Sequence, residues 1–176
     1  YVADSAQHRV KVFRRDGAFV RAFGSEGTAP GCLRVPVSVA VDDSRGYVAV
    51  CEYHGNRVQL FDADCCLVMQ IGREGGGQGQ FRHPCGVAFS KEGMLVVADQ
   101  GNCRVQVFNQ AGQFLRMFGE KGSAPGQFQL ISSLALSPHG DFVVADVGQQ
   151  RCHLFSSEGV FAQVLGGPAR VEPGAA

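Results

Sequence analysis

Hydrophobic residues along this chain come in short alternating runs. In one stretch, apolar runs at 85–89, 94–99, 104–108 and 114–118 are separated by turns rich in Gly, Asn, Lys and Glu. Alternation of this kind over four to eight residues is typical of β-strands, and no stretch combines a helical period with capping residues. The pattern predicts a meander of four antiparallel strands.

This meander is one copy of an internal repeat. Segments of the form apolar-x-apolar-Phe begin at residues 10, 58, 105 and 152, at steps of 48, 47 and 47. The same steps relate an acidic residue at the end of each second strand to an arginine at the start of each third strand. These residues are Asp4, Glu52, Asp99 and Asp146, with Arg9, Arg57, Arg104 and Arg151. A repeated four-stranded unit of this length is typical of a β-propeller blade.

The repeat also predicts where the blades begin and end. Residues 1–34 are expected to form a first blade that lacks its first strand, together with a linker. The second, third and fourth blades are expected at 35–82, 83–129 and 130–167. Prolines and small residues predict a disordered tail at 168–176. With about 3.75 blades, the chain is expected to be an open arc or a fragment of a larger ring.

The repeated residues resemble the NHL family of β-propellers. The resemblance is carried by Val-Ala-Asp at 97–99, Arg-Val-Gln-Val-Phe at 104–108, Gly-Gln-Phe at 126–128, and the prolines Pro36 and Pro84 before two first strands. The linkers look most like those of animal TRIM-type proteins, which carry RING, B-box and coiled-coil segments. The resemblance implies an all-β propeller with about six blades. Further blades of a parent chain, or another copy, would then be needed to close the ring.

Composition and charge exclude some classes of partner. The 16 Lys and Arg balance the 16 Asp and Glu, so no overall field favours DNA or an anionic membrane surface. No apolar run approaches the roughly 20 residues of a membrane-spanning helix. The 7 cysteines include no Cys-x-x-Cys pair. Reduced thiols are therefore expected, which predicts a cytoplasmic protein, with the nucleus as the alternative.

Catalytic and cofactor motifs are absent from the sequence. Peptide-amidating lyases resemble NHL propellers and bind metal through histidines near the axis, so a metal-dependent lyase is a remote alternative. The histidines here do not recur at one repeat position: His8, His54, His83, His139 and His153. The Gly-rich linkers lack the Gly-Lys-Ser/Thr of a phosphate-binding loop and are expected to be flexible connections. We expect no catalytic residue, no metal and no cofactor.

Two sets of residues are candidates for a role. The repeated acid–arginine pairs are expected to brace each hairpin, because architecture recurs in every blade and chemistry does not. Flat and cationic side chains are expected to gather at the second turns and linkers of neighbouring blades. They are Tyr53, His54, Arg34, Arg73, Arg82 and His83.

This second set is compatible with two functions. Cations beside flat side chains suit single-stranded RNA, as in an NHL propeller of post-transcriptional regulation. Acidic residues in the same linkers, Glu26, Glu74 and Glu120, favour a protein partner instead. The leading hypothesis is a non-catalytic module for substrate or adaptor recognition. The resemblance implies that it comes from a TRIM-like, RING-type E3 ubiquitin ligase.

Overall fold

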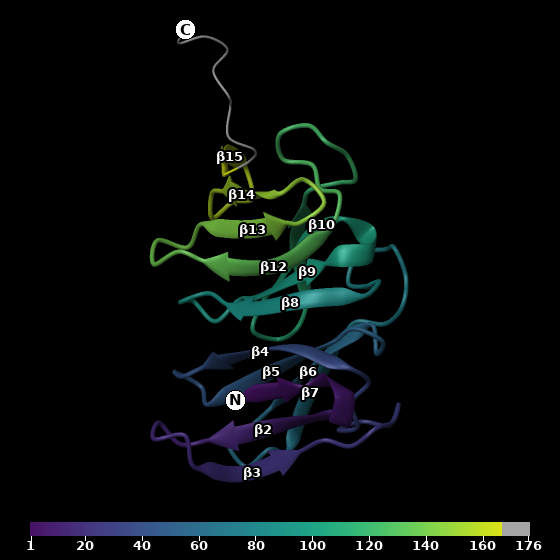
Figure 1. Cartoon of the computed structure of the whole chain (residues 1–176), viewed down its shortest axis with the longest axis vertical. Helices are drawn as coiled ribbons and strands as arrows, with labels where there is room; N and C mark the ends of the chain where they lie inside the picture. The colour runs from purple at the N-terminus through teal and green to yellow at the C-terminus, as the bar shows by residue number, and fades with distance from the viewer. Residues whose placement is uncertain (167–176) are drawn as a thin grey trace, which may run out of the picture.

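Each sequence repeat folds as one antiparallel sheet, and the sheets stack side by side along the molecule as blades 1 to 4 (Figure 1). The computed structural model describes residues 1–166. Blade 1 contains β1 (Val2–Asp4), β2 (Arg9–Phe13) and β3 (Phe19–Phe23). Blade 2 contains β4 (Pro36–Asp42), β5 (Tyr47–Glu52), β6 (Arg57–Phe61) and β7 (Leu67–Ile71). Blade 3 contains β8 (Pro84–Phe89), β9 (Leu95–Asp99), β10 (Arg104–Phe108) and β11 (Phe114–Phe118). Blade 4 contains β12 (Ile131–Leu136), β13 (Phe142–Asp146), β14 (Arg151–Phe155) and β15 (Phe161–Leu165).

These sheets confirm the predicted fold class, an all-β propeller arc. Strands that are adjacent in sequence pair within each sheet, as a meander requires. Two short 3-10 helices, η1 (Ser5–Gln7) and η2 (Gln100–Asn102), follow the second strands of blades 1 and 3. Within residues 1–166, no helix is long and apolar enough to span a membrane.

The connections divide between two ends of the sheets, visible at opposite edges of Figure 1. We call one end the linker face. It holds the turns between second and third strands, at 5–8, 53–56, 100–103 and 147–150. It also holds the linkers between blades, at 24–35, 72–83 and 119–130. We call the other end the turn face, which holds the remaining turns (14–18, 43–46, 62–66, 90–94, 109–113, 137–141, 156–160). Turns and linkers of neighbouring blades come together on each of these two faces.

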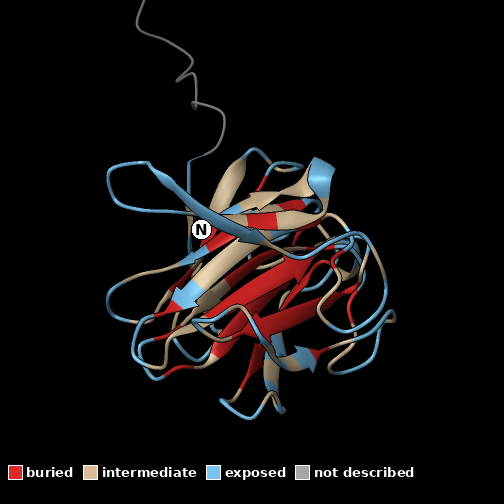
Figure 2. Ribbon diagram, turned by 90° about the horizontal axis from the view of Figure 1, so that it is seen from below, coloured by how far each residue is buried: buried red, intermediate tan, exposed pale blue. Residues whose placement is uncertain are grey.

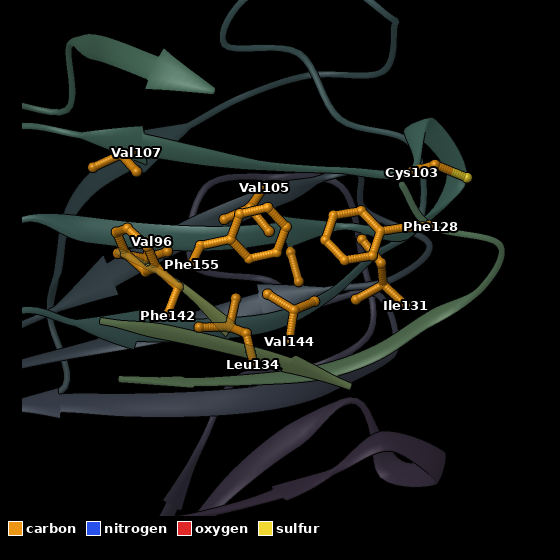
Figure 3. Close-up of a cluster of buried hydrophobic side chains, with 11 residues drawn as sticks. Val96, Cys103, Val105, Val107, Phe128, Ile131, Leu134, Phe142, Val144 and Phe155 are labelled. Carbon is orange, nitrogen blue, oxygen red and sulfur yellow. The ribbon is translucent and has the colours of Figure 1, made fainter. Parts of the chain in front are cut away.

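The hydrophobic core lies between blades. Alternate side chains of a strand point to opposite faces of its sheet, so each middle strand supplies two interfaces. In the interface of blades 3 and 4, Val105 and Val107 pack with Phe142 and Phe155 (Figure 3). Figure 2 shows the same principle, with buried residues along the strands and exposed residues in the connections.

Each linker contributes one fully buried apolar residue to this core. Leu33, Phe81 and Phe128 are each 0% exposed. The Phe81 N–H donates to the Arg73 carbonyl oxygen at 2.8 Å, and the other two linkers have the equivalent bond at the same length. The linkers are therefore ordered turns, each held between blades by a buried side chain and a backbone hydrogen bond. The prediction that they are flexible connections is wrong.

The outward faces of blades 1 and 4 carry apolar residues, and residues 1–166 place no sheet against them. Four side chains of blade 4 are only partly buried, although their repeat equivalents in blade 3 are all 0% exposed. The blade 4 residues are Val143, Ala145, Cys152 and Leu154, and the blade 3 residues are Val96, Ala98, Val105 and Val107. The described residues thus form an open arc. The tail predicted at 168–176 lies outside them.

Candidate functional site

A buried carboxylate at the end of each second strand organises the linker face of blades 2 and 3. Asp99 accepts hydrogen bonds from Arg104 Nε at 2.9 Å, from Gln106 Nε2 at 3.2 Å and from the Arg82 N–H at 2.7 Å. Glu52 makes the equivalent set in blade 2, with Arg57 Nε, Gln59 Nε2 and the Arg34 N–H each at 2.7 Å. The carboxylate thus joins the hairpin to the end of the preceding linker, beyond the hairpin brace that the sequence predicts.

The arginine and a glutamine of the third strand extend this network along the linker. Arg104 Nη2 donates to the carbonyl oxygens of Gly77 at 2.7 Å and Gln80 at 2.9 Å. Gln106 Nε2 donates to the Gln80 carbonyl oxygen at 2.7 Å, and its Oε1 accepts from the Gly79 N–H at 2.9 Å. Sequence reasoning missed this glutamine, although the repeat steps that revealed the arginines also relate Lys11, Gln59, Gln106 and His153.

The network is altered at both ends of the arc. In blade 1, Asp4 pairs with Arg9 at 3.2 Å and with Lys11 at 2.8 Å in a more exposed setting. In blade 4, the pairing of Asp146 with Arg151 that the repeat predicts does not form. Gln149 Nε2 donates to Asp146 Oδ2 at 2.8 Å instead.

The displaced arginine of blade 4 has other partners. Arg151 Nη2 donates to Gln149 Oε1 and to the Ser123 carbonyl oxygen, and its Nε lies 3.3 Å from His153 Nε2. His153 is fully buried and its Nδ1 has no hydrogen-bond partner. Burial lowers the pKa of His153, and the positive charge of Arg151 lowers it further. The fourth blade therefore holds a neutral imidazole where blades 2 and 3 hold a glutamine.

Three rings from two blades meet on the linker face. Tyr53 and His54 lie in the turn after β5, and His83 lies at the end of the linker before β8. The rings of Tyr53 and His83 stack with centroids 4.7 Å apart and planes at 11°. His54 lies 5.3 Å from Tyr53 and 6.0 Å from His83, again between ring centroids. We call Tyr53, His54 and His83 the ring cluster.

The backbone around the ring cluster is held in place by hydrogen bonds. His83 has φ 49°, in the left-handed region that disfavours residues with a Cβ. Its N–H donates to Asn56 Oδ1 at 2.8 Å, which fixes this conformation. Tyr53 Oη donates to Gln100 Oε1 of blade 3 at 3.2 Å, which ties the ring to the next blade. The ring cluster is thus built by the junction of blades 2 and 3.

The three candidate arginines occupy different places. Arg34 and Arg82 are exposed residues at the ends of linkers, and their backbone N–H groups are held by Glu52 and Asp99. Neither side chain forms an ion pair with any of residues 1–166. Arg73 lies further back in its linker, beside a shallow hollow that 78–80 also line. The three rings contact one another, whereas the grouping of Arg73 with them stays a prediction.

The ring cluster occurs once, whereas the carboxylate network recurs. The repeat equivalents of Tyr53 are Ser5, Gln100 and Val147, and those of His54 are Ala6, Gly101 and Gly148. The equivalents of His83 are Val35 and Leu130. A feature that the fold requires would recur in every blade. The ring cluster is therefore the best candidate for a site whose role is not architectural.

The described residues form no metal-binding cluster, and burial suppresses two of their thiols. None of them form a group of three or more His, Cys, Asp or Glu side chains arranged to hold a metal ion. All seven cysteines are free thiols. Burial raises the pKa of Cys85 to about 12 and the pKa of the fully buried Cys51 well above its ordinary value. These two thiols remain protonated at neutral pH, which makes them poor nucleophiles.

Comparisons with known proteins agree with the architecture. Residues 81–108 match the NHL repeat. No curated protein sequence matches the chain. Similar solved structures include hydrazine synthase of Kuenenia stuttgartiensis, at 15% identity and a TM-score of 0.68, over 92% of this chain and 44% of that one. A protein of unknown function from Bacteroides caccae has 14% identity and a TM-score of 0.66, over 93% and 56% of the two chains.

A third similar structure is a streptogramin B lyase, with 10% identity and a TM-score of 0.71, over 94% of this chain and 50% of that one. The chain thus spans about half the length of these relatives. Identities this low show a shared fold alone, and the activities of these proteins are not carried over to this chain. The chain therefore carries an NHL repeat at residues 81–108 within an open β-propeller arc.

Proposed function

We propose that this chain is a non-catalytic protein-interaction module that binds its partner at the ring cluster. The observation that carries the proposal is that Tyr53, His54 and His83 meet once, at the junction of two blades, and have no equivalent at the other blade junctions. His54 and His83 are exposed, and Tyr53 is half-buried between them. Tyrosine and arginine are enriched among the residues that dominate binding energy at protein interfaces.

The surroundings of the ring cluster favour a protein partner. Arg34 and Arg82 supply cations, and Glu26 and Glu74 in the linkers supply exposed carboxylates on the same face. A surface with both signs of charge complements a folded protein surface, which also carries both signs. Because the linkers resemble those of TRIM-type NHL proteins, we extend the proposal. The chain would recognise substrates or adaptors for a TRIM-like, RING-type ubiquitin ligase in the cytoplasm.

Single-stranded RNA is a second candidate, supported by a specific observation. The exposed side chains of Arg34 and Arg82 have no carboxylate partner among residues 1–166, and both lie in the linkers of the face that bears the rings. Unpaired cations with stacking rings suit a phosphate backbone and its bases. Binding to RNA through several phosphates would weaken steeply as salt rises, whereas protein binding would depend on salt far less.

The experiment compares three versions of the chain in quantitative affinity capture, followed by titration of the purified partner. The site variant is Tyr53→Ala with His83→Ala, and the control is Arg14→Ala with Arg15→Ala, two exposed residues on the turn face. The proposal expects a partner that binds the wild type and the control but loses at least tenfold in affinity for the site variant, since each tenfold loss corresponds to about 1.4 kcal/mol. Equal binding to all three proteins would refute it.

A further inference from the structure

A groove on the turn face separates blades 3 and 4. Its inner part has a volume of about 590 Å³ and is lined by 89–92 of blade 3 and 136–140 of blade 4. Its outer part, about 370 Å³, shares five of these residues and adds Arg116, Phe142 and Glu158 among others. The shared residues make the two parts continuous. Together they have the size of a site for a small ligand or the end of a peptide.

The equivalent position between blades 2 and 3 is filled by an arginine. Arg45 donates to Asp42 Oδ2 and to the Gly93 carbonyl oxygen, and its guanidinium lies 5.3 Å from the Tyr47 ring and 5.8 Å from the Phe89 ring. Between the equivalent strand pairs 41–48 and 89–95, blade 2 has one residue more than blade 3, and its strands pair once more through Asp42 and Tyr47. The blade 3 turn at 90–94 contains no arginine. The groove between blades 3 and 4 therefore stays open.

The outer part of the groove contains an unsatisfied donor. Arg116 Nη2 donates to the Ser157 carbonyl oxygen, while the buried Nε has no hydrogen-bond partner. Because Nε is buried, a ligand in the groove can reach only the remaining guanidinium N–H groups of Arg116, which are strong hydrogen-bond donors. Arg21, the equivalent residue of blade 1, donates likewise to the Ala63 carbonyl oxygen, and blade 2 has Met69 at this position.

Two carboxylates line the same outer part. Glu92 and Glu158 are exposed and form no ion pair with any described residue. A hydrogen bond with Ser90 lowers the pKa of Glu92, which is therefore ionised at neutral pH. Leu136 and Pro138 supply apolar surface in the inner part, which Lys91 and His139 also line. The groove thus offers two carboxylates, the Arg116 guanidinium and some apolar surface, with one cation, Lys91, beside Glu92.

We infer that this groove binds a primary ammonium next to a carbonyl, attached to an apolar side chain. The ammonium would pair with Glu92 and Glu158, the carbonyl oxygen would accept from the Arg116 guanidinium, and the side chain would lie against Leu136 and Pro138. The amino end of a peptide with an apolar first residue and a free apolar amino acid share this chemistry. The site lies on the opposite face from the ring cluster and does not depend on it.

Calorimetric titration of the purified chain with four probes tests this inference. The probes are Leu-Gly-Gly amide, its N-acetylated form, Gly-Gly-Gly amide and free leucine. We expect Leu-Gly-Gly amide to bind and both acetylation and loss of the leucine side chain to weaken binding about tenfold or more. Tighter binding of the peptide than of leucine assigns the site to a chain end, and equal or tighter binding of leucine assigns it to a free amino acid.

Variants of the chain locate the binding. Arg116→Met introduces the residue that blade 2 already has. Arg21→Met is the matched control, because it removes the equivalent arginine-to-carbonyl hydrogen bond in blade 1, away from the groove. Glu92→Gln with Glu158→Gln changes only exposed side chains, which keeps the test informative if Arg116→Met unfolds. The inference expects the groove variants to lose about tenfold in affinity, with no change for the control. It is overturned if the acetylated peptide binds as well as the free one, if the groove variants bind normally, or if no probe binds at millimolar concentration.

Discussion

Tyr53 and His83 stack at 4.7 Å between ring centroids although they come from different blades. The same junction is tied by the Tyr53 hydroxyl to Gln100, whose Nε2 donates in turn to the Ile131 carbonyl oxygen of blade 4 at 2.6 Å. The linker face therefore holds a chain of contacts that joins blades 2, 3 and 4. A partner bound at the ring cluster would contact a surface that is fixed before binding, which lowers the entropic cost of association.

The buried carboxylate network predicts unequal effects at equivalent positions. Asp99→Ala leaves the buried Arg104 without its counter-charge and should lower the free energy of unfolding by about 3–5 kcal/mol. Asp4→Ala removes the equivalent but more exposed pair and should lower the free energy of unfolding far less. Urea denaturation measures both. Equal losses would show that burial of the carboxylate does not set its contribution.

His153 predicts a pH-dependent weakness in blade 4. Burial and the neighbouring Arg151 lower its pKa in the folded chain, so the unfolded chain binds a proton first as pH falls below about 6.5. Stability should therefore be complete above that pH and decline as pH falls towards the folded pKa, with Asp146 partly opposing the shift.

His153→Gln introduces the residue of blades 2 and 3 and should remove this decline. We expect the free energies of unfolding of variant and wild type to diverge between pH 7.5 and pH 5.5, with the variant more stable at the lower pH. Contributions of the other histidines cancel in the comparison. Parallel pH profiles for the two proteins would contradict the role given to His153.

The cysteines predict an order of thiol reactivity. Cys66 is exposed in a turn, whereas Cys51 is fully buried and burial raises the pKa of Cys85 to about 12. Iodoacetamide at pH 8 should modify Cys66 in the native chain and leave Cys51 and Cys85 unmodified. Peptide mass mapping identifies the sites, and labelling in denaturant provides the control in which all seven react. Early modification of Cys51 in the native chain would show that the interface of blades 2 and 3 opens.

The linker aromatics predict large losses of stability. Phe81→Ala empties a fully buried position between blades and should lower the free energy of unfolding by about 3–5 kcal/mol. Leu115→Ala, at a side chain 44% exposed, is the control and should change it by less than about 1 kcal/mol. Denaturant titration separates the two. A small effect of Phe81→Ala would mean that the linkers are the loose connections that their glycines suggest.

The repeat made much of the fold predictable, because its steps place equivalent residues such as Arg57 and Arg104 at equivalent strand starts. It failed where one blade departs from the others: Gln149 displaces Arg151 from Asp146, and nothing in the spacing indicates which side chain reaches the carboxylate. The linkers were misjudged because their glycines suggest mobility, while one buried residue such as Phe81 orders each turn.

The candidate site was partly predictable for the same reason. Sequence order places Tyr53 and His83 on one face, but the stacking of their rings depends on the positive φ of His83 and the bond to Asn56. Arg73, predicted with them, lies elsewhere in its linker. The groove beside Arg116 was missed, since it arises from one residue fewer between the strand pairs 41–48 and 89–95 and not from any motif.

The most direct test of the central claim is photo-crosslinking from the ring cluster in cells. A photoreactive benzoyl-phenylalanine is placed at His54 in one variant and at Arg14, an exposed residue on the turn face of blade 1, in another. The account predicts a discrete crosslinked protein from position 54, resistant to ribonuclease, and none from position 14. Crosslinks that arise equally from both positions, or only from position 14, would contradict a binding site at the junction of blades 2 and 3.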